Sequence, residues 1–365
     1  MEMVWSYLFL VVAVGIISFA VCFRLRKWAI LKNITQRVRD RDIHSKPLPR
    51  IGGLGIFISF WLVVTLILVF SADRLKFVDE TVWGLDRNLF GVLLGALIIA
   101  SVMLYDDIKG VKWSGKLLAQ FLAGFAVAGF GVTINWINNP FDSLIHLDQT
   151  IFTIGNFSFS WGQLFVVLWI VLIMNVVNWL DGVDGLASGV VIIATLAIFL
   201  LAISPRINQP AVAILAIILA GSVFGFLPFN FSPARMFLGD TGSMFLGYML
   251  AILAIISGGK VATASLIMGL PLLDGIWVVS NRLIHHKSPF EADQNHIHHR
   301  LMRAGLTVKQ TVLMLYAGSI IFGYVALRTG PEGKFWALIW LIGVMLFLSG
   351  GLVMLEWIRR IKKDR

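Results

Sequence analysis

The sequence is built from long apolar segments, several of which run for about 20 residues without a charged side chain. A helix of that length crosses the hydrocarbon core of a lipid bilayer. Hydrophobic residues make up 58% of the chain and charged residues only 14%, whereas soluble domains average roughly half and a quarter. We therefore expect an all-α polytopic membrane protein, and the composition excludes a soluble globular domain.

Eleven segments are candidates for membrane-spanning helices, and together they make one integral membrane domain over residues 1–365. Their boundaries are 4–23, 52–70, 89–105, 117–134, 161–178, 187–204, 210–227, 241–257, 261–281, 311–328 and 335–357. Outside these segments, residues 135–160 alternate polar and apolar side chains around Gly155 and Asn156. This pattern predicts a small extracytoplasmic hairpin near residues 150–160.

Lysine and arginine lie mainly in the loops on one side of this arrangement and in the C-terminal tail. Because cytoplasmic loops carry an excess of these residues, we expect the N-terminus outside and the C-terminus in the cytoplasm, in the cell inner (cytoplasmic) membrane. The net charge of +10 then reflects topology and attraction to membrane lipids and nucleotide phosphates. No nucleic-acid motif is present. The unusual polar clusters fall in the expected cytoplasmic loops, which are 24–51, 105–116, 178–186, 228–241 and 282–310.

Two adjacent carboxylates, Asp106 and Asp107, follow the apolar segment 89–105. Acids at the C-terminal end of a helix oppose its dipole, and like charges side by side repel each other. A divalent cation, or a nearby lysine such as Lys116, would relieve both effects. A solvated pair at a helix end is the alternative, but we favour a site in which one aspartate acts as a general base or nucleophile.

The segment 175–185 reads Asn-Val-Val-Asn-Trp-Leu-Asp-Gly-Val-Asp-Gly. Asn175, Asn178 and Asp181 recur every three residues, so they share one face at the end of a helix. Oxygen ligands of this kind suit Mg²⁺, which binds one or two protein groups together with phosphate oxygens. A helix C-cap with acids in the turn, including Asp184, would explain the glycines but not two amides at membrane depth.

Phe237 and Asp240 belong to the stretch Phe-Leu-Gly-Asp-Thr-Gly-Ser at 237–243. Asp240 and Thr241 are expected to cap the N-terminus of the next helix, an end that also favours phosphate. Phe237 is a candidate for stacking on a base, although a buried packing role explains it equally well.

Three histidines, His296, His298 and His299, occur within four residues and are followed by Arg300. Zinc sites usually need three or four suitably spaced ligands, and the chain has a single cysteine. Imidazoles beside arginines, which include Arg282, fit recognition of an anion or a sugar better.

The first loop ends with Ser-Lys-Pro-Leu-Pro-Arg-Ile-Gly-Gly at 45–53. Its prolines and glycines predict a rigid turn into the next span. This structural role and a phosphate-binding role for Lys46 explain the motif equally well.

Five motifs, taken in chain order, resemble those of the polyprenyl-phosphate N-acetylhexosamine-1-phosphate transferases. They are Lys-Pro-x-Pro-Arg-x-Gly-Gly at 46–53, Asp-Asp at 106–107, Asn-x-x-Asp-Gly-x-Asp-Gly-Leu-Ala at 178–187, Phe-Leu-Gly-Asp-Thr-Gly-Ser at 237–243, and Ser-Pro-Phe…His-Ile-His-His-Arg at 288–300. The last motif is similar to that of the undecaprenyl-phosphate GlcNAc-1-phosphate transferase branch, which serves enterobacterial-antigen, O-antigen (lipopolysaccharide) and teichoic-acid linkage synthesis. Arg300 departs from some members, in which an apolar residue follows the histidines.

The resemblance implies transfer of GlcNAc-1-phosphate from UDP-GlcNAc to undecaprenyl phosphate, with Mg²⁺ or Mn²⁺ as cofactor. The products would be undecaprenyl-diphosphate-GlcNAc and UMP, in the first membrane step of a cell-envelope polysaccharide pathway. Another UDP-N-acetylhexosamine, or UDP-MurNAc-pentapeptide, stays open as the donor. An ion-coupled transporter is an alternative of a different class, but transporter sites lie near the bilayer midplane, away from span ends.

The same resemblance implies roles for individual residues. Asp106, Asp107 and Lys116 are expected to be catalytic. Asn178 and Asp240 are expected to hold the metal. The residues expected to bind the nucleotide and the substrates are Lys46, Asp181, Asp184, Phe237, Arg282, His296, His298, His299 and Arg300. Because related enzymes are often dimeric, a homodimer is expected as well.

Overall fold

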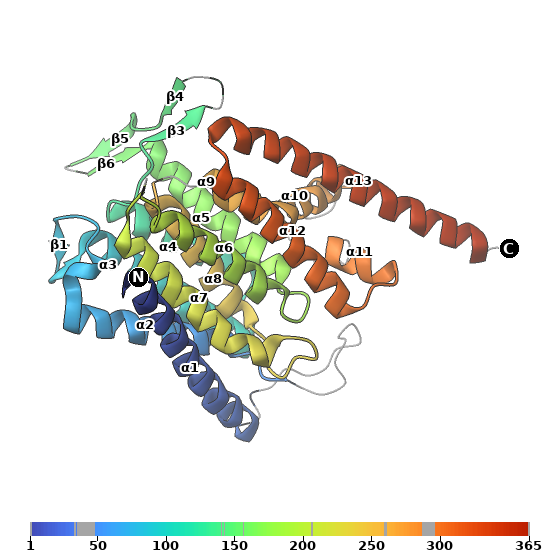
Figure 1. The fold of residues 1–365 in the computed structure, drawn as a ribbon, viewed down its shortest axis with the longest axis horizontal. Coiled ribbons are helices and arrows are strands. Elements are labelled where there is room, and N and C mark those ends of the chain that lie inside the picture. Colours follow the sequence, from blue (N-terminus) through green and yellow to red (C-terminus); the bar gives the residue numbers. More distant parts are fainter. Residues whose placement is uncertain are drawn as a thin grey trace.

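The structure, a computed structural model, describes residues 2–32, 34, 48–139, 141, 143–155, 157–205, 207–258, 261–286 and 296–363. Its helices run roughly side by side in one bundle, and short β-hairpins gather at one end of it (Figure 1). The predicted all-α membrane architecture is therefore confirmed in its main features, with strands confined to the connections.

Eight helices in the described part of the chain are long and apolar enough to cross a membrane. They are α1 (Glu2–Leu31), α2 (Gly52–Ser71), α3 (Arg87–Lys109), α5 (Trp161–Leu180), α7 (Pro210–Asn230), α8 (Gly239–Ile256), α12 (Val308–Arg328) and α13 (Pro331–Lys363). A ninth span results if α9 (Val261–Ile267) and α10 (Gly269–Ile284), which are bent by 80° relative to each other, are taken together.

The expected number of eleven spans is not confirmed, although helices occupy all eleven expected segments. Helices α4 (Trp113–Gly129) and α6 (Leu186–Ala202) have 17 residues each, fewer than the roughly 20 that cross a bilayer at right angles. The expected span 261–281 is broken into α9 and α10. The orientation of the bundle in the membrane stays a prediction.

Three two-stranded antiparallel hairpins connect the helices. They pair β1 (Thr81–Val82) with β2 (Leu85–Asp86), β3 (Trp136–Asn139) with β4 (Ser143–His146), and β5 (Thr150–Ile154) with β6 (Phe157–Ser160). The hairpin expected near residues 150–160 is thus confirmed, while Asn156 itself lies outside the described residues. In Figure 1, β3–β6 lie at the upper left end of the bundle, and α11 (Ile297–Arg303) lies towards the opposite end.

Side-chain caps fix where several helices begin after these connections. Asp86 accepts a hydrogen bond from the Leu89 N–H at 3.0 Å and so starts α3 directly after β2. Ser160 and Gln163 form a reciprocal capping box at the start of α5. Because these caps fix where α3 and α5 begin, they also fix which residues lie at the opposite ends of the two helices, next to the candidate site.

Helix α8 is the centre of the bundle. In its span 94% of the residues are buried, against 17% in α1. It packs against α2, α3 and α5. A Cβ at Gly247 would lie 2.6 Å from the Cα of Met174, so glycine is required for this close approach to α5. The buried Tyr248 donates a hydrogen bond to the carbonyl of Val92 on α3 at 2.8 Å. The N-terminus of α8, with Asp240, is therefore held between its neighbours.

Candidate active site

The ends of four helices meet at the end of the bundle away from β3–β6. Helix α3 ends here at Lys109 and α4 begins at Trp113, while α5 ends at Leu180 and α8 begins at Gly239. Most of the polar residues singled out in the sequence lie at or next to these ends. The site is therefore assembled from residues far apart in the chain.

Lys116 joins three of these helices through its ammonium group. Its Nζ lies 2.6 Å from Oδ2 of Asp106 on α3 and 2.6 Å from Oδ2 of Asp240 on α8. Arg50 reaches the other oxygen of Asp240, with its guanidinium nitrogen 3.3 Å from Oδ1. All of these groups are partly shielded from solvent, so the two carboxylates are held close together by cations that lie between and beside them.

Asp107 makes a different set of contacts from its neighbour in sequence. Its Oδ1 accepts the Asp240 N–H at 2.9 Å, and its Oδ2 accepts both the N–H and the hydroxyl of Thr241, at 2.9 and 2.7 Å. The unpaired N–H groups at the start of α8 stabilise a carboxylate in this position. The expectation that Asp240 and Thr241 cap this helix is wrong, because α8 begins one residue earlier, at Gly239, and Asp107 of α3 supplies the acceptor.

The turn before α2 is bound to the segment that leads into α8. The Gly52 N–H donates to the Phe237 carbonyl at 3.0 Å, and the Phe237 N–H donates to the Pro49 carbonyl at 2.9 Å. Gly53 lies so close to Gly242 that a Cβ would be 2.0 Å from the Gly242 nitrogen. These backbone contacts bring Arg50 to Asp240. Lys46, from the same motif, lies outside the described residues.

Gly239 has a left-handed backbone conformation, with φ of 77°. A Cβ at this position would lie 2.3 Å from the Arg50 carbonyl oxygen and 2.8 Å from Oδ2 of Asp107. Both the backbone angle and the lack of space therefore require glycine here. The Gly239 N–H also donates to Asp181 at the end of α5.

Asp181 and Asn178 place the end of α5 beside the start of α8. The Asn178 amide donates to the Ser243 hydroxyl at 2.9 Å. Burial raises the pKa of Asp181 well above its usual range, an effect that Arg50 opposes and that Asp240 reinforces. Asn178 and Asp181 therefore join the end of α5 to the start of α8.

The other amide of this segment, Asn175, points to α4. Its Nδ2 donates to the Gln120 side-chain oxygen at 2.8 Å, so this pair ties α5 to α4. Asp184 accepts the Ala234 N–H at 2.9 Å and so holds the loop before α8. The half-buried Phe237 lies in that loop. Structural contacts explain Asn175 and Asp184, while the substrate roles of Asp184 and Phe237 stay predictions.

The three carboxylates of the cluster, Asp106, Asp107 and Asp240, bring oxygen atoms within 4.8 Å of one another. Carboxylate oxygens are the ligands that Mg²⁺ and Mn²⁺ prefer. Asn178 of α5, whose amide donates to Ser243 one helical turn after Asp240, brings a further side-chain oxygen to the same region. The donor chemistry at this end of the bundle therefore fits an oxygen-preferring divalent cation.

The histidine motif is held by a residue that sequence reasoning missed. Asp274, a buried residue of α10, accepts a hydrogen bond from His296 Nδ1 at 2.8 Å and from the Ile297 N–H at 2.8 Å. His296 also stacks against Trp179 of α5, with ring centroids 6.2 Å apart. An acid inside the apolar run 269–284 was a signal that could have identified Asp274, because such residues are costly in a membrane.

His298 and His299 lie over the turn that follows α5. A Cβ at Gly182 would be 3.1 Å from His298 Nε2 and 3.7 Å from His299 Nε2. Burial, together with the neighbouring His299 and His296, lowers the pKa of His298 well below its usual range. The imidazole of His298 is thus neutral at physiological pH.

The two arginines of this region are buried to a similar degree, with 7% of Arg282 and 5% of Arg300 exposed. Arg300 donates to the Ser349 carbonyl of α13 at 2.7 Å, so it fixes α11 to the C-terminal helix. This contact gives Arg300 a structural function, and its substrate-binding role stays a prediction. The first part of the histidine motif, at 288–290, lies outside the described residues.

Comparison with known proteins identifies the family. Residues 89–258, which include the acidic cluster, match glycosyl transferase family 4. The chain is also 30% identical over 332 residues to a probable undecaprenyl-phosphate N-acetylglucosaminyl 1-phosphate transferase of Bacillus subtilis, covering 89% of this chain and 84% of the relative. The chain belongs to the polyprenyl-phosphate N-acetylhexosamine-1-phosphate transferases.

Other members of the transferase family are similar to this chain over most of its length. A decaprenyl-phosphate N-acetylglucosaminephosphotransferase of Mycobacterium tuberculosis is 30% identical, over 78% of this chain and 73% of the relative. A phospho-N-acetylmuramoyl-pentapeptide-transferase of Staphylococcus aureus is 26% identical, over 84% and 92%. The resemblance drawn from five sequence motifs is therefore confirmed, and the protein is a multi-pass membrane transferase.

Proposed function

We propose that this transferase moves GlcNAc-1-phosphate from UDP-GlcNAc to undecaprenyl phosphate, giving undecaprenyl-diphosphate-GlcNAc and UMP at the cytoplasmic face of the inner membrane. The observation that carries this proposal is the meeting of Asp106, Asp107, Asp240 and Lys116 at one end of the bundle. Both substrates are anionic phosphates, so their reaction needs cations close to carboxylates that can bind metal or accept a proton.

Asp240 and Asn178 are the residues that would hold Mg²⁺ or Mn²⁺, with Asp181 beside them. The ion, when bound, supplies positive charge that weakens the link between the sugar phosphate and UMP. Arg50 and Lys116 hold Asp240 in place and leave it ionised. They also add positive charge of their own next to the phosphates.

Asp106 and Asp107 have separate tasks because their contacts differ. Asp106 shares Lys116 with Asp240 and is the better placed to orient or deprotonate the phosphate of undecaprenyl phosphate. Asp107 is bound to the start of α8 through Asp240 and Thr241, so it sets the position of the metal-binding residue. Lys116 steadies the charge that passes between the two phosphates.

The sugar nucleotide is bound at the end of α5, next to the histidines of α11. His296, held by Asp274, and His298, beside Gly182, flank the same turn from which Asp181 reaches the cluster. The names of the Bacillus subtilis and Mycobacterium tuberculosis relatives favour a GlcNAc donor. The lower similarity to the Staphylococcus aureus enzyme makes UDP-MurNAc-pentapeptide the second candidate.

The test uses membranes that contain the full chain, radiolabelled UDP-GlcNAc, Mg²⁺ and undecaprenyl phosphate. Label should enter the lipid phase while UMP is released, and UDP-MurNAc-pentapeptide in place of UDP-GlcNAc should give little product. Asp240→Asn should abolish the reaction, whereas Asp148→Asn, on an exposed residue of the hairpin end, should not. Uptake of label into sealed vesicles without a lipid product would support the transporter and contradict the proposal.

A further inference from the structure

A cavity of about 1600 Å³ lies at the end of the bundle opposite the candidate active site. Helix α2 begins at Gly52 beside the acidic cluster, and its last turn, at Phe70 and Ser71, lines the cavity. A helix of 20 residues spans about 30 Å. The cavity is therefore separate from the site where phosphates are exchanged.

The walls of this cavity are mainly apolar where membrane-spanning helices form them. Leu10, Val14 and Ile17 of α1 face Val63 and Ile67 of α2, and α7 closes the third side. The volume exceeds the roughly 300–1000 Å³ of sites for drug-sized ligands. A wide space with hydrocarbon walls, open between outer helices of a membrane bundle, has the shape and chemistry to take lipid acyl chains.

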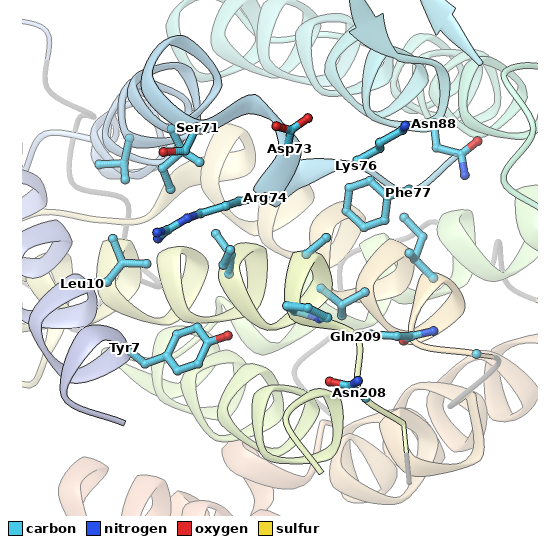
Figure 2. Close-up of a pocket in the computed structure, with 18 of the residues that line it drawn as sticks. Tyr7, Leu10, Ser71, Asp73, Arg74, Lys76, Phe77, Asn88, Asn208 and Gln209 are labelled. Atoms are coloured by element: carbon cyan, nitrogen blue, oxygen red, sulfur yellow. The ribbon is translucent and has the colours of Figure 1, made fainter. Parts of the chain in front are cut away.

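One charged side chain points across this apolar space. Arg74, in the short 3-10 helix η1 (Ala72–Leu75) after α2, extends towards Leu10 and Tyr7, while Asp73 points away (Figure 2). The neighbouring cations are paired, Lys76 with Asp79 at 2.9 Å and Arg87 with Glu80. Among the residues that the structure describes, no carboxylate pairs with Arg74. An arginine in such surroundings binds an anion, and phosphate is the group that its planar donors fit best.

Three amide side chains also line the cavity. Gln209 and Asn208, just before α7, line it together with Asn88 from the start of α3 (Figure 2). The side-chain oxygen of Gln209 is buried and lacks a hydrogen-bond partner in the described part of the chain.

We propose that the cavity binds one anionic glycerophospholipid, with its phosphate on Arg74 and its acyl chains against α1, α2 and α7. The polyprenyl phosphate substrate is the less suitable occupant, because its phosphate must reach the opposite end of the bundle. A second copy of the chain would first cover Val12 and Ile16, which are 53% and 65% exposed and do not line the cavity.

The test is native mass spectrometry of the purified full chain after incubation with dioleoylphosphatidylglycerol, dioleoylglycerol or undecaprenyl phosphate. One phosphatidylglycerol per chain should stay bound, and dioleoylglycerol, which lacks the phosphate, should be retained at least tenfold less. Arg74→Gln should weaken retention of phosphatidylglycerol about tenfold or more, because it removes a charge-assisted hydrogen bond. Arg328→Gln, on a solvent-exposed arginine at the end of α12, is the matched control and should change nothing.

A second variant tests the cavity without changing charge. Ala13→Trp fills the space between α1 and α2, so it should release the lipid and remove the increase in melting temperature that phosphatidylglycerol gives the wild type. Equal retention of dioleoylglycerol and phosphatidylglycerol, a preferential retention of undecaprenyl phosphate that Arg74→Gln removes, or a lipid-free dimer as the only species would each overturn the proposal.

Discussion

The two ends of the bundle handle charge in opposite ways. At the acidic end, every carboxylate of the cluster is within hydrogen-bond distance of a cation or of a helix N-terminus, and Lys116 touches two of them. At the hairpin end, Arg74 crosses a wide apolar cavity, and its neighbours pair with one another instead. A cluster of paired charges is suited to a site where phosphates react. A single cation in an apolar space suits a lipid that stays in place.

The largest effect is expected from Lys116→Met. The change leaves Asp106 and Asp240 close together without the cation that joins them, and for this partly buried ion pair the cost is at most about 3 kcal/mol. Transferase activity should disappear, and the midpoint of thermal unfolding should fall. Lys109→Met, on a lysine that lies over the Tyr105 ring at the end of α3, is the control. Activity close to that of the wild type in Lys116→Met would show that the two carboxylates are not coupled through this residue.

Two glycines with the same backbone conformation allow the cost of the backbone angle to be separated from the cost of steric crowding. Gly239 and Gly84 have φ of 77° and 82°, but only Gly239 is crowded, by the Arg50 carbonyl and Asp107. Gly84→Ala, in the open turn between β1 and β2, should cost about 1 kcal/mol of unfolding free energy from the backbone angle alone. Gly239→Ala should cost at least about 2 kcal/mol and also reduce turnover, because the added methyl group displaces Asp107.

These two variants are compared by thermal unfolding in detergent and by the transferase assay. Equal losses of stability in both would mean that the contact of Gly239 with the turn before α2 carries no strain. Normal turnover in Gly239→Ala would separate this contact from catalysis.

Asp274→Asn should lower kcat/KM by about tenfold. The carboxylate fixes His296 through a hydrogen bond worth about 1.5 kcal/mol or more, and an amide, with one acceptor oxygen, cannot accept from both His296 Nδ1 and the Ile297 N–H. The pair of His146 and Asp148, 3.9 Å apart and exposed at the hairpin end, supplies the control Asp148→Asn. The pH dependence of kcat/KM should change in Asp274→Asn alone. An unchanged pH profile would reduce Asp274 to a structural role.

The smallest effect concerns the dependence of stability on pH. The pKa of His298 is lowered in the folded protein, whereas an unfolded histidine has a pKa of about 6.5. As the pH falls below about 6.5, this histidine is protonated in the unfolded chain but stays neutral in the folded chain. The contribution of His298 to the free energy of unfolding is therefore fully present above this pH and declines below it. His298→Phe should flatten this decline in melting temperature between pH 7 and pH 5. His146→Phe, at the exposed hairpin, should leave the decline as it is.

The sequence predicted the parts of the site that lie within single motifs, and it failed where contacts depend on packing. Periodicity placed Asn178 and Asp181 on one helix end, and hydropathy placed Asp106 and Lys116 on either side of one short loop. The binding of Asp107 to the start of α8 could not be predicted, because it depends on how closely α3 packs against a helix more than a hundred residues away. The contact of Asp274 with His296 depends in the same way on α10 and α11 meeting.

The number of membrane spans shows a related limit. Hydropathy identified the long apolar helices, but it could not tell that α4 and α6 stop at 17 residues or that the chain bends by 80° between α9 and α10. Phe130 ends α4 through local backbone geometry, after which the chain enters the β3–β4 hairpin. Such endings depend on turns and neighbours that averaged hydrophobicity does not record.

The buried position of α8 bears on how the protein is made. Its mean hydropathy of 1.5 is the lowest among the eight spans, and its first turns carry Asp240, Thr241 and Ser243. A segment of this kind partitions poorly from the translocon into lipid by itself. The helices that surround it, α2, α3 and α5, are all synthesised earlier. They are therefore already in the bilayer when α8 is inserted, so that Asp240 enters the membrane next to the helices that carry its partners.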